Sequence, residues 1–115
     1  MIRILPLGRR CEASIAAAVD RAVAEFGRLD CMFANAGIVG AVGPIDTALA
    51  EEYDATMDIN LRGPFLCMKH AARIMKPQGS GVILSCSSIA ALRGGLGPHV
   101  YTAAKTALIG LTRNV

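Results

Sequence analysis

A tyrosine and a lysine near the end of the chain have the spacing of an acid–base pair. Tyr101 and Lys105 are four residues apart, and Ser88 lies thirteen positions before the tyrosine. On a helix, side chains four positions apart lie on one face, so the ammonium can approach the phenol. A positive charge favours the ionised phenolate, which makes the tyrosine usable for proton transfer. The spacing therefore predicts a site that exchanges a proton with an alcohol or a carbonyl oxygen.

The position of the serine agrees with this chemistry. Ser88 follows the apolar run from Gly81 to Cys86, which has the character of a strand buried in a parallel sheet. Ligands of open α/β sheets bind at the carboxyl ends of the strands, so the hydroxyl can hydrogen-bond the substrate oxygen. A Tyr-x-x-x-Lys pair also occurs on ordinary amphipathic helices, where the lysine is solvated. The pair alone does not establish catalysis.

Two elements precede this region. Residues 12–27 place apolar side chains on one stripe, from Ile15 to Phe26, and predict an amphipathic helix that Gly27 ends. The apolar run over residues 29–34 then predicts a strand buried on both faces.

Two longer helices complete the pattern. From Asp46 or Thr47, either a suitable N-cap, we expect helix to Met75, where Pro77 and the glycines after it break it. A last helix is expected from about His99. The alternation of helices with strands requires right-handed parallel crossovers, which places the chain in the α/β class.

The composition describes a globular chain. Of its 115 residues, 53% are hydrophobic and 18% are charged, which argues against disorder. The apolar runs fall far short of the roughly 20 residues that cross a bilayer, so we expect no membrane span. The net charge of +3 comes from three arginines among the first ten residues. The rest of the chain therefore has no basic patch to bind a nucleic acid. We expect a cytoplasmic location by default.

Cysteines and histidines suggest no further site. The four cysteines, Cys11, Cys31, Cys67 and Cys86, lie far apart, and three are in apolar segments. This pattern favours buried, reduced thiols over a disulfide framework or a metal site. The two histidines are expected to be structural or exposed.

Two asparagines extend the candidate site. Asn35-Ala36-Gly37 directly follows the first strand, and Asn60 lies in the segment MDINLRGPF. With the serine, tyrosine and lysine, these motifs resemble the short-chain dehydrogenases/reductases, whose signature has a serine thirteen residues before Tyr-x-x-x-Lys. The resemblance covers residues 12–115.

The resemblance implies reversible hydride transfer between NAD or NADP and a secondary alcohol or ketone. Tyr101 would exchange the hydroxyl proton, and Ser88 would orient the substrate oxygen. Lys105 would assist the tyrosine and hold the nicotinamide ribose. The carbonyl of Asn60 would hold a water that relays protons to the lysine.

The same resemblance implies that Asn35, Ala36 and Gly37 approach the cofactor through their backbone, together with Tyr101 and Lys105.

A proline supports the role of Asn60 in physical terms. Pro64 has no N–H, and in an α-helix that group would bond the carbonyl of residue 60. The carbonyl therefore lacks its helical donor. Gly63-Pro64 is also consistent with a simple kink or with the start of a new helix.

Parts of the family's pattern do not occur in this sequence. The glycine-rich loop T-G-x-x-x-G-x-G is absent, as is the segment that selects between NAD and NADP. We therefore expect residues 1–10 to be unmatched sequence and residues 11–115 to be the central, catalytic part of a Rossmann-like domain. Of the family's strand order 3-2-1-4-5-6-7, only strands 4 and 5 would remain in this partial doubly wound sheet.

Right-handed crossovers would put all the helices on one face of these two strands. Cys31, Phe33, Val82 and Leu84, or the residues alternating with them, would then be exposed on the other face. Each large apolar side chain in water forgoes roughly 1.5 to 3 kcal/mol. We therefore expect marginal stability, oligomers or aggregation.

Two functions stay open at this point. The first is an oxidoreductase, or the surviving part of one, whose substrate is open among hydroxysteroids, sugars, polyols, terpenoid alcohols and acyl thioesters. The second is an interaction fragment that binds no cofactor. In both, the resemblance implies a homo-oligomer formed through the two long helices.

Overall fold

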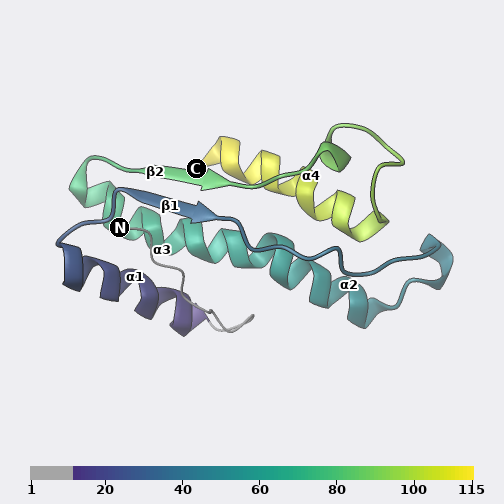
Figure 1. Ribbon diagram of the computed structural model, residues 1–115, viewed down its shortest axis with the longest axis horizontal. Helices are drawn as coiled ribbons and strands as arrows, with labels where there is room; N and C mark the ends of the chain where they lie inside the picture. The colour runs from purple at the N-terminus through teal and green to yellow at the C-terminus, as the bar shows by residue number, and fades with distance from the viewer. Residues whose placement is uncertain (1–11) are drawn as a thin grey trace.

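Two short parallel strands form the centre of the structure, a computed structural model that describes residues 12–115 (Figure 1). Strand β1 (Cys31–Ala34) pairs with β2 (Val82–Ser85), with Cys31 opposite Val82 and Ala34 opposite Ser85. The expected α/β class and parallel pairing are confirmed. The unmatched segment expected at residues 1–10 lies outside the described residues.

Helices separate and follow the strands. The helical elements, with short 3₁₀ turns marked η1 and η3 and a wide π-turn marked η2, are α1 (Glu12–Phe26), η1 (Ile45–Thr47), α2 (Ala50–Met57), η2 (Asp58–Arg62), α3 (Gly63–Gln78), η3 (Ile89–Ala91) and α4 (His99–Asn114). In Figure 1, α2 and α3 run on as one long helix beneath the strands. None of the helices in residues 12–115 has the length and apolar character needed to cross a membrane.

Helix α1 ends where the sequence predicts. Gly27 adopts φ 78°, a left-handed conformation that glycine accepts without penalty, and its N–H donates to the carbonyl of Val23 over 2.7 Å. Ile15 and Val19 are buried, whereas Phe26, expected on the same stripe, is 48% exposed. Burial of the apolar stripe therefore decreases toward the end of α1.

Ion pairs tie α1 to α3. Lys69 and His70 of α3 both contact the carboxylate of Glu12, and Arg73 pairs with Asp20. The hydrogen bond from Lys69, followed by that from His70, lowers the pKa of Glu12 from its ordinary value. A charged carboxylate is therefore favoured at the start of α1, where the helix dipole also favours an anion.

The predicted N-cap of the long helix is wrong. Asp46 and Thr47 lie in η1, and the hydroxyl of Thr47 donates to the carbonyl of Pro44 within that turn. The helix begins after Leu49, which makes no side-chain capping bond. The Thr47 hydroxyl bonds within its own turn and so does not cap the helix. The residue types that mark a helix start do not distinguish these two uses of a threonine.

The predicted end of that helix is also wrong. The helix continues through Pro77 to Gln78 and ends at Gly79, which has φ 71° and donates its N–H to the carbonyl of Lys76. Proline costs a helix one hydrogen bond, and in the last turn Gln78 supplies other bonds.

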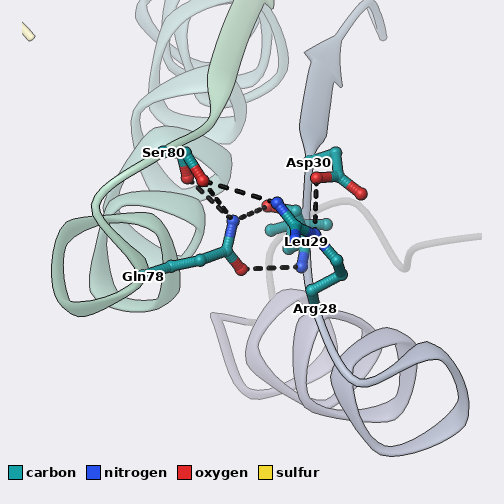
Figure 2. Close-up of polar contacts among 5 residues, drawn as sticks. All are labelled: Arg28, Leu29, Asp30, Gln78 and Ser80. Atoms are coloured by element: carbon teal, nitrogen blue, oxygen red, sulfur yellow. Dashed lines mark hydrogen bonds and ion pairs between the residues drawn. The ribbon is translucent and has the colours of Figure 1, made fainter.

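Gln78 joins the end of α3 to the start of β1 (Figure 2). Its Nε2 donates to the carbonyl of Leu29 over 3.0 Å and to that of Ser80, and its Oε1 accepts from the N–H of Leu29. The first ladder bond follows at once, from the N–H of Val82 to the carbonyl of Asp30 over 2.9 Å. The amide side chain thus satisfies the backbone of the residue that precedes the paired region.

One face of the sheet is packed and the other is exposed. Helices α3 and α4 contact the strands, and Ser85 on the packed face shares a 2.7 Å hydrogen bond with Thr112 of α4. On the opposite face Phe33, Val82 and Leu84 are 57%, 55% and 48% exposed, and Cys31 is exposed. Burial of the strands on both faces is therefore wrong. The predicted exposure of these four residues is confirmed.

Replacing Phe33 by threonine should reduce self-association without unfolding the chain, because the side chain lies in water and threonine favours a strand. The matched change Ile83→Thr, on the packed face, should lower the free energy of unfolding by about 1 kcal/mol or more. Size-exclusion chromatography with light scattering and urea titration measure the two effects. Equal destabilisation by both changes would show that the face is covered.

Candidate active site

Lys105 is a buried cation held at the carboxyl end of β2. Its side chain lies on α4, the residue is 4% exposed, and Nζ donates to the carbonyl of Cys86 over 2.7 Å. The same Nζ lies 5.7 Å from the centroid of the Tyr101 ring. A buried charge is costly unless it has polar partners, so the carbonyl and the electron-rich ring both stabilise it. The ammonium and the phenol ring are thus brought together.

The segment after β2 is bonded to α4 at the same point. The hydroxyl of Ser87 donates to the backbone carbonyl of Lys105 over 2.8 Å. Ser88 follows and caps η3, where its Oγ accepts the N–H of Ala90 over 3.2 Å. Its side chain is partly buried, and it lies two residues beyond the carbonyl that holds the lysine.

The loop between Ser88 and Tyr101 folds back on the start of α4. A Cβ on Gly97 would lie 3.0 Å from Cβ of Ala90 and 3.4 Å from Cδ1 of Tyr101. The two ends of the loop therefore meet at this glycine. The serine and the tyrosine flank one short loop beyond the carboxyl end of β2.

Asn60 is fully buried and holds the segment after β1. Its Nδ2 donates to the carbonyl of Ile38, and its Oδ1 accepts the N–H of the same residue, each over 2.8 Å. The side-chain amide thus pairs with both backbone groups of Ile38, as a residue of a neighbouring strand would. Thus the side chain of Asn60 positions a loop, and this role is separate from the one expected for its backbone carbonyl, which is to hold a water.

The helix widens around Asn60. In the π-turn Asp58–Arg62 the N–H of Gly63 bonds the carbonyl of Asp58, five residues back. Pro64 lies in the first turn of α3 and has no N–H for the carbonyl of residue 60. The helix continues through this turn, because Arg62 and Gly63 keep right-handed helical angles. The alternative of a separate helix start is therefore wrong.

Gly37 brings the asparagine and the lysine together. A Cβ at this position would lie 3.1 Å from Oδ1 of Asn60 and 3.2 Å from Nζ of Lys105. Asn35, Ala36 and Gly37 are exposed at the end of β1. A Cβ here would require Oδ1 of Asn60 and Nζ of Lys105 to shift by a few tenths of an ångström, so glycine fits this close approach best. Three motifs that are far apart in the sequence thus meet at one glycine.

Two hydroxyl residues of the site were missed by the sequence analysis. Ser87 lies beside the predicted serine, and Thr56 lies four residues before Asn60 on the same helix face. The i, i+4 spacing of the threonine and the asparagine was the available signal. His70 and His99 take no part in this site: the first contacts Glu12, and the second is exposed.

The cysteines differ in burial. Cys31 and Cys86 are exposed, so the expectation of buried thiols is wrong for both, because the strand face and end that carry them are uncovered. Burial raises the pKa of the Cys67 thiol on α3 and favours its neutral form. All three are free thiols.

A family model matches residues 4–115 of the chain; its description is "Enoyl-(Acyl carrier protein) reductase". Xanthoxin dehydrogenase from Arabidopsis thaliana is 48% identical over 107 residues, covering 92% of this chain and 38% of the relative. (+)-Borneol dehydrogenase 2 from Salvia officinalis is 50% identical over 105 residues, covering 90% and 37%. The chain belongs to the short-chain dehydrogenase/reductase family. It spans somewhat more than a third of the length of these relatives.

Solved structures of the family have the same fold. The structure titled "ElxO with NADP Bound" is 31% identical, with a TM-score of 0.91 over 98% of this chain and 46% of that one. NAD+-bound xylitol dehydrogenase is 32% identical, with a TM-score of 0.85 over 90% and 40%. The described residues are thus part of a Rossmann-like dehydrogenase fold.

Replacing Asn60 by alanine should lower the free energy of unfolding by about 2 to 4 kcal/mol, because two backbone groups of Ile38 lose their partners. The exposed Asn35 is the control, and its change to alanine should cost less than about 0.5 kcal/mol. Urea denaturation followed by circular dichroism gives both values. A loss below 1 kcal/mol for Asn60→Ala would contradict the role of its amide.

Proposed function

We propose that this chain is the catalytic part of an NAD- or NADP-dependent oxidoreductase that interconverts a secondary alcohol and a ketone. The observation that carries the proposal is the buried ammonium of Lys105, which lies over the Tyr101 ring and against Gly37. The family includes dehydrogenases and reductases, which supports this reaction class. We also propose a cytoplasmic location, because Cys31, Cys67 and Cys86 are all free thiols.

The proposed acid–base group is the Tyr101 hydroxyl. The Lys105 ammonium lies 5.7 Å from the centre of its ring, and the hydroxyl would accept the proton of an alcohol and return it to a ketone. Ser88 would hydrogen-bond the same substrate oxygen and orient it. Its Oγ already accepts the N–H of Ala90, which leaves its proton free to be donated to that oxygen. The water-relay role of the Asn60 carbonyl, which lacks an α-helical donor, is part of this proposal.

The site fits a nicotinamide nucleotide at two points. Gly37 lies beside the lysine, where a Cβ would be 3.2 Å from Nζ, and it follows the exposed Asn35 and Ala36, so the backbone of these three residues can approach a cofactor next to the ammonium. Lys105 has three N–H donors, of which one bonds the Cys86 carbonyl, so others can bond ribose hydroxyls. When bound, the nicotinamide would supply or accept the hydride. The choice between NAD and NADP stays open.

The loop after β2 favours an apolar substrate. Ile89, Leu92 and Leu96 are 70%, 77% and 47% exposed between the serine and the tyrosine, and Arg93 is the one charged residue in the loop. Pockets for hydrocarbon ligands are typically lined by apolar side chains with a few polar groups, and these three residues lie in the loop that joins Ser88 to Tyr101. The relatives named for xanthoxin and (+)-borneol agree with such a substrate.

Replacing Tyr101 by phenylalanine should reduce alcohol oxidation by about a hundredfold or more, because the ring stays under the ammonium and only the proton-transfer group is lost. Binding of NADH or NADPH, followed by nicotinamide fluorescence, should be nearly unchanged. Tyr53→Phe, at a 47% exposed position on α2, is the control and should leave turnover unaffected. Unchanged turnover in Tyr101→Phe would refute the assignment, and a lack of binding to either nucleotide would remove the enzyme function for this chain.

We propose, second, that the chain forms homo-oligomers through α3 and α4, which also serves the interaction-fragment alternative. A mostly apolar groove of about 420 Å³ lies between the π-turn with the start of α3 and the outer side of α4. Its lining includes Leu61, Phe65, Ala107 and Leu111, together with Asp58 and Arg62. A two-fold pairing would bury these apolar side chains against their copies.

Replacing Phe65 by aspartate should shift oligomers toward monomer, because a charge would be buried in the proposed interface. Phe26→Asp is the matched control, since Phe26 on α1 is 48% exposed and Phe65 is 47% exposed. Light scattering after size-exclusion chromatography gives the mass. The same mass shift in both variants would argue against a specific interface.

A further inference from the structure

Thr56 is a buried hydroxyl residue with bonds on two sides. It lies on α2 and is 1% exposed. Its Oγ1 donates to the carbonyl of Glu52 over 2.6 Å and accepts the N–H of Ala41 over 3.0 Å. The first bond, to a carbonyl four residues back, is common for threonine in helices. The second bond reaches out of the helix to the loop after β1, and Ala41 is itself buried.

Gly40 is shaped for this contact. It has φ +70°, and a Cβ at this position would lie 2.1 Å from Oγ1 of Thr56 and 2.5 Å from its Cγ2. Any other residue would overlap the threonine and would also be strained by the left-handed backbone. The backbone of the loop therefore lies directly against the side chain.

Thr56 and Asn60 hold the loop at two points. They are four residues apart on one face of the helix, and Asn60 bonds both backbone groups of Ile38. With Ala41 bonded to Thr56, both ends of the segment 38–41 are fixed. One point of attachment would leave the segment free to swivel, whereas two set its direction.

We propose that Thr56 is a positioning residue that fixes the segment 38–41 and thereby keeps Gly37 beside Lys105. The segment begins at the residue after Gly37, where an added Cβ would lie 3.2 Å from Nζ of Lys105. Any effect on cofactor binding rests on the proposed function. The hydroxyl is the required group, since valine would fill the same volume without accepting the bond.

Thr56→Val and Thr56→Ser test this role in the whole chain by amide hydrogen exchange measured with NMR. Valine should speed exchange at the N–H of Ala41 by about tenfold or more, which corresponds to about 1.4 kcal/mol, and should shift the Gly37 amide signal. Serine keeps the hydroxyl and should restore both. The N–H of Val82 in the strand ladder reports global opening and should change much less. Unchanged exchange at Ala41, or an equal increase at Val82, would overturn the proposal.

A second pair of variants covers the case in which Thr56→Val does not fold. Gly40→Ala and Gly43→Ala both put alanine at a positive φ, +70° and +108°, but only Gly40 faces Thr56, whereas Gly43 has open space. Exchange at Ala41 should be about tenfold faster in Gly40→Ala than in Gly43→Ala. Equal rates in the two variants would overturn the proposal.

Nucleotide titration separates this inference from the proposed function. If the chain binds NADH or NADPH, Thr56→Val should weaken binding by about tenfold and Thr56→Ser by less than about twofold. Equal affinity in the valine variant would overturn the link to the cofactor. If the unchanged chain binds neither nucleotide, the proposed function fails, and the exchange rates at Ala41 still decide whether Thr56 fixes the segment.

Discussion

The arrangement of the site depends on accommodating one buried ammonium. Lys105 is nearly inaccessible to water, and such a charge is tolerated only with polar partners. The Cys86 carbonyl holds α4 to the end of β2 through the lysine, and the Tyr101 ring, one turn earlier on α4, lies 5.7 Å from Nζ. The glycine at position 37 lets the other strand end come close. The positions of α4 and of the two strand ends are therefore all constrained by the Lys105 ammonium.

The polar loops are stabilised by side chains, because two short strands supply few ladder bonds. Asn60 and Thr56 satisfy backbone groups beyond the carboxyl end of β1, and Gln78 does so at its amino end. Amide and hydroxyl groups on the long helix thus extend the sheet's hydrogen bonding in both directions. This explains how a sheet with one uncovered face can still present ordered loops.

Much of the fold follows from local patterns. The glycine that ends α1, the apolar runs and the start at His99 predicted elements that the structure confirms, because these signals depend on nearby residues. The exposed face followed from crossover handedness. The N-cap of α2 and the end of α3 could not be predicted, since Thr47 bonds within its own turn and Gln78 compensates for a proline through contacts 49 residues away. The spacing of Tyr101 and Lys105 predicted that they lie together. The bond of Thr56 to Ala41 could not be predicted, because it depends on the path of the loop after β1.

The π-turn sets the rotational phase of the long helix. One extra residue in a turn offsets every later side chain by about 100° around the axis. Upstream of the turn, Thr56 is directed at the loop after β1; downstream, Leu66, Met68 and Met75 are buried. A one-residue deletion there would remove this offset and rotate the residues on one side of the turn by about 100° relative to those on the other.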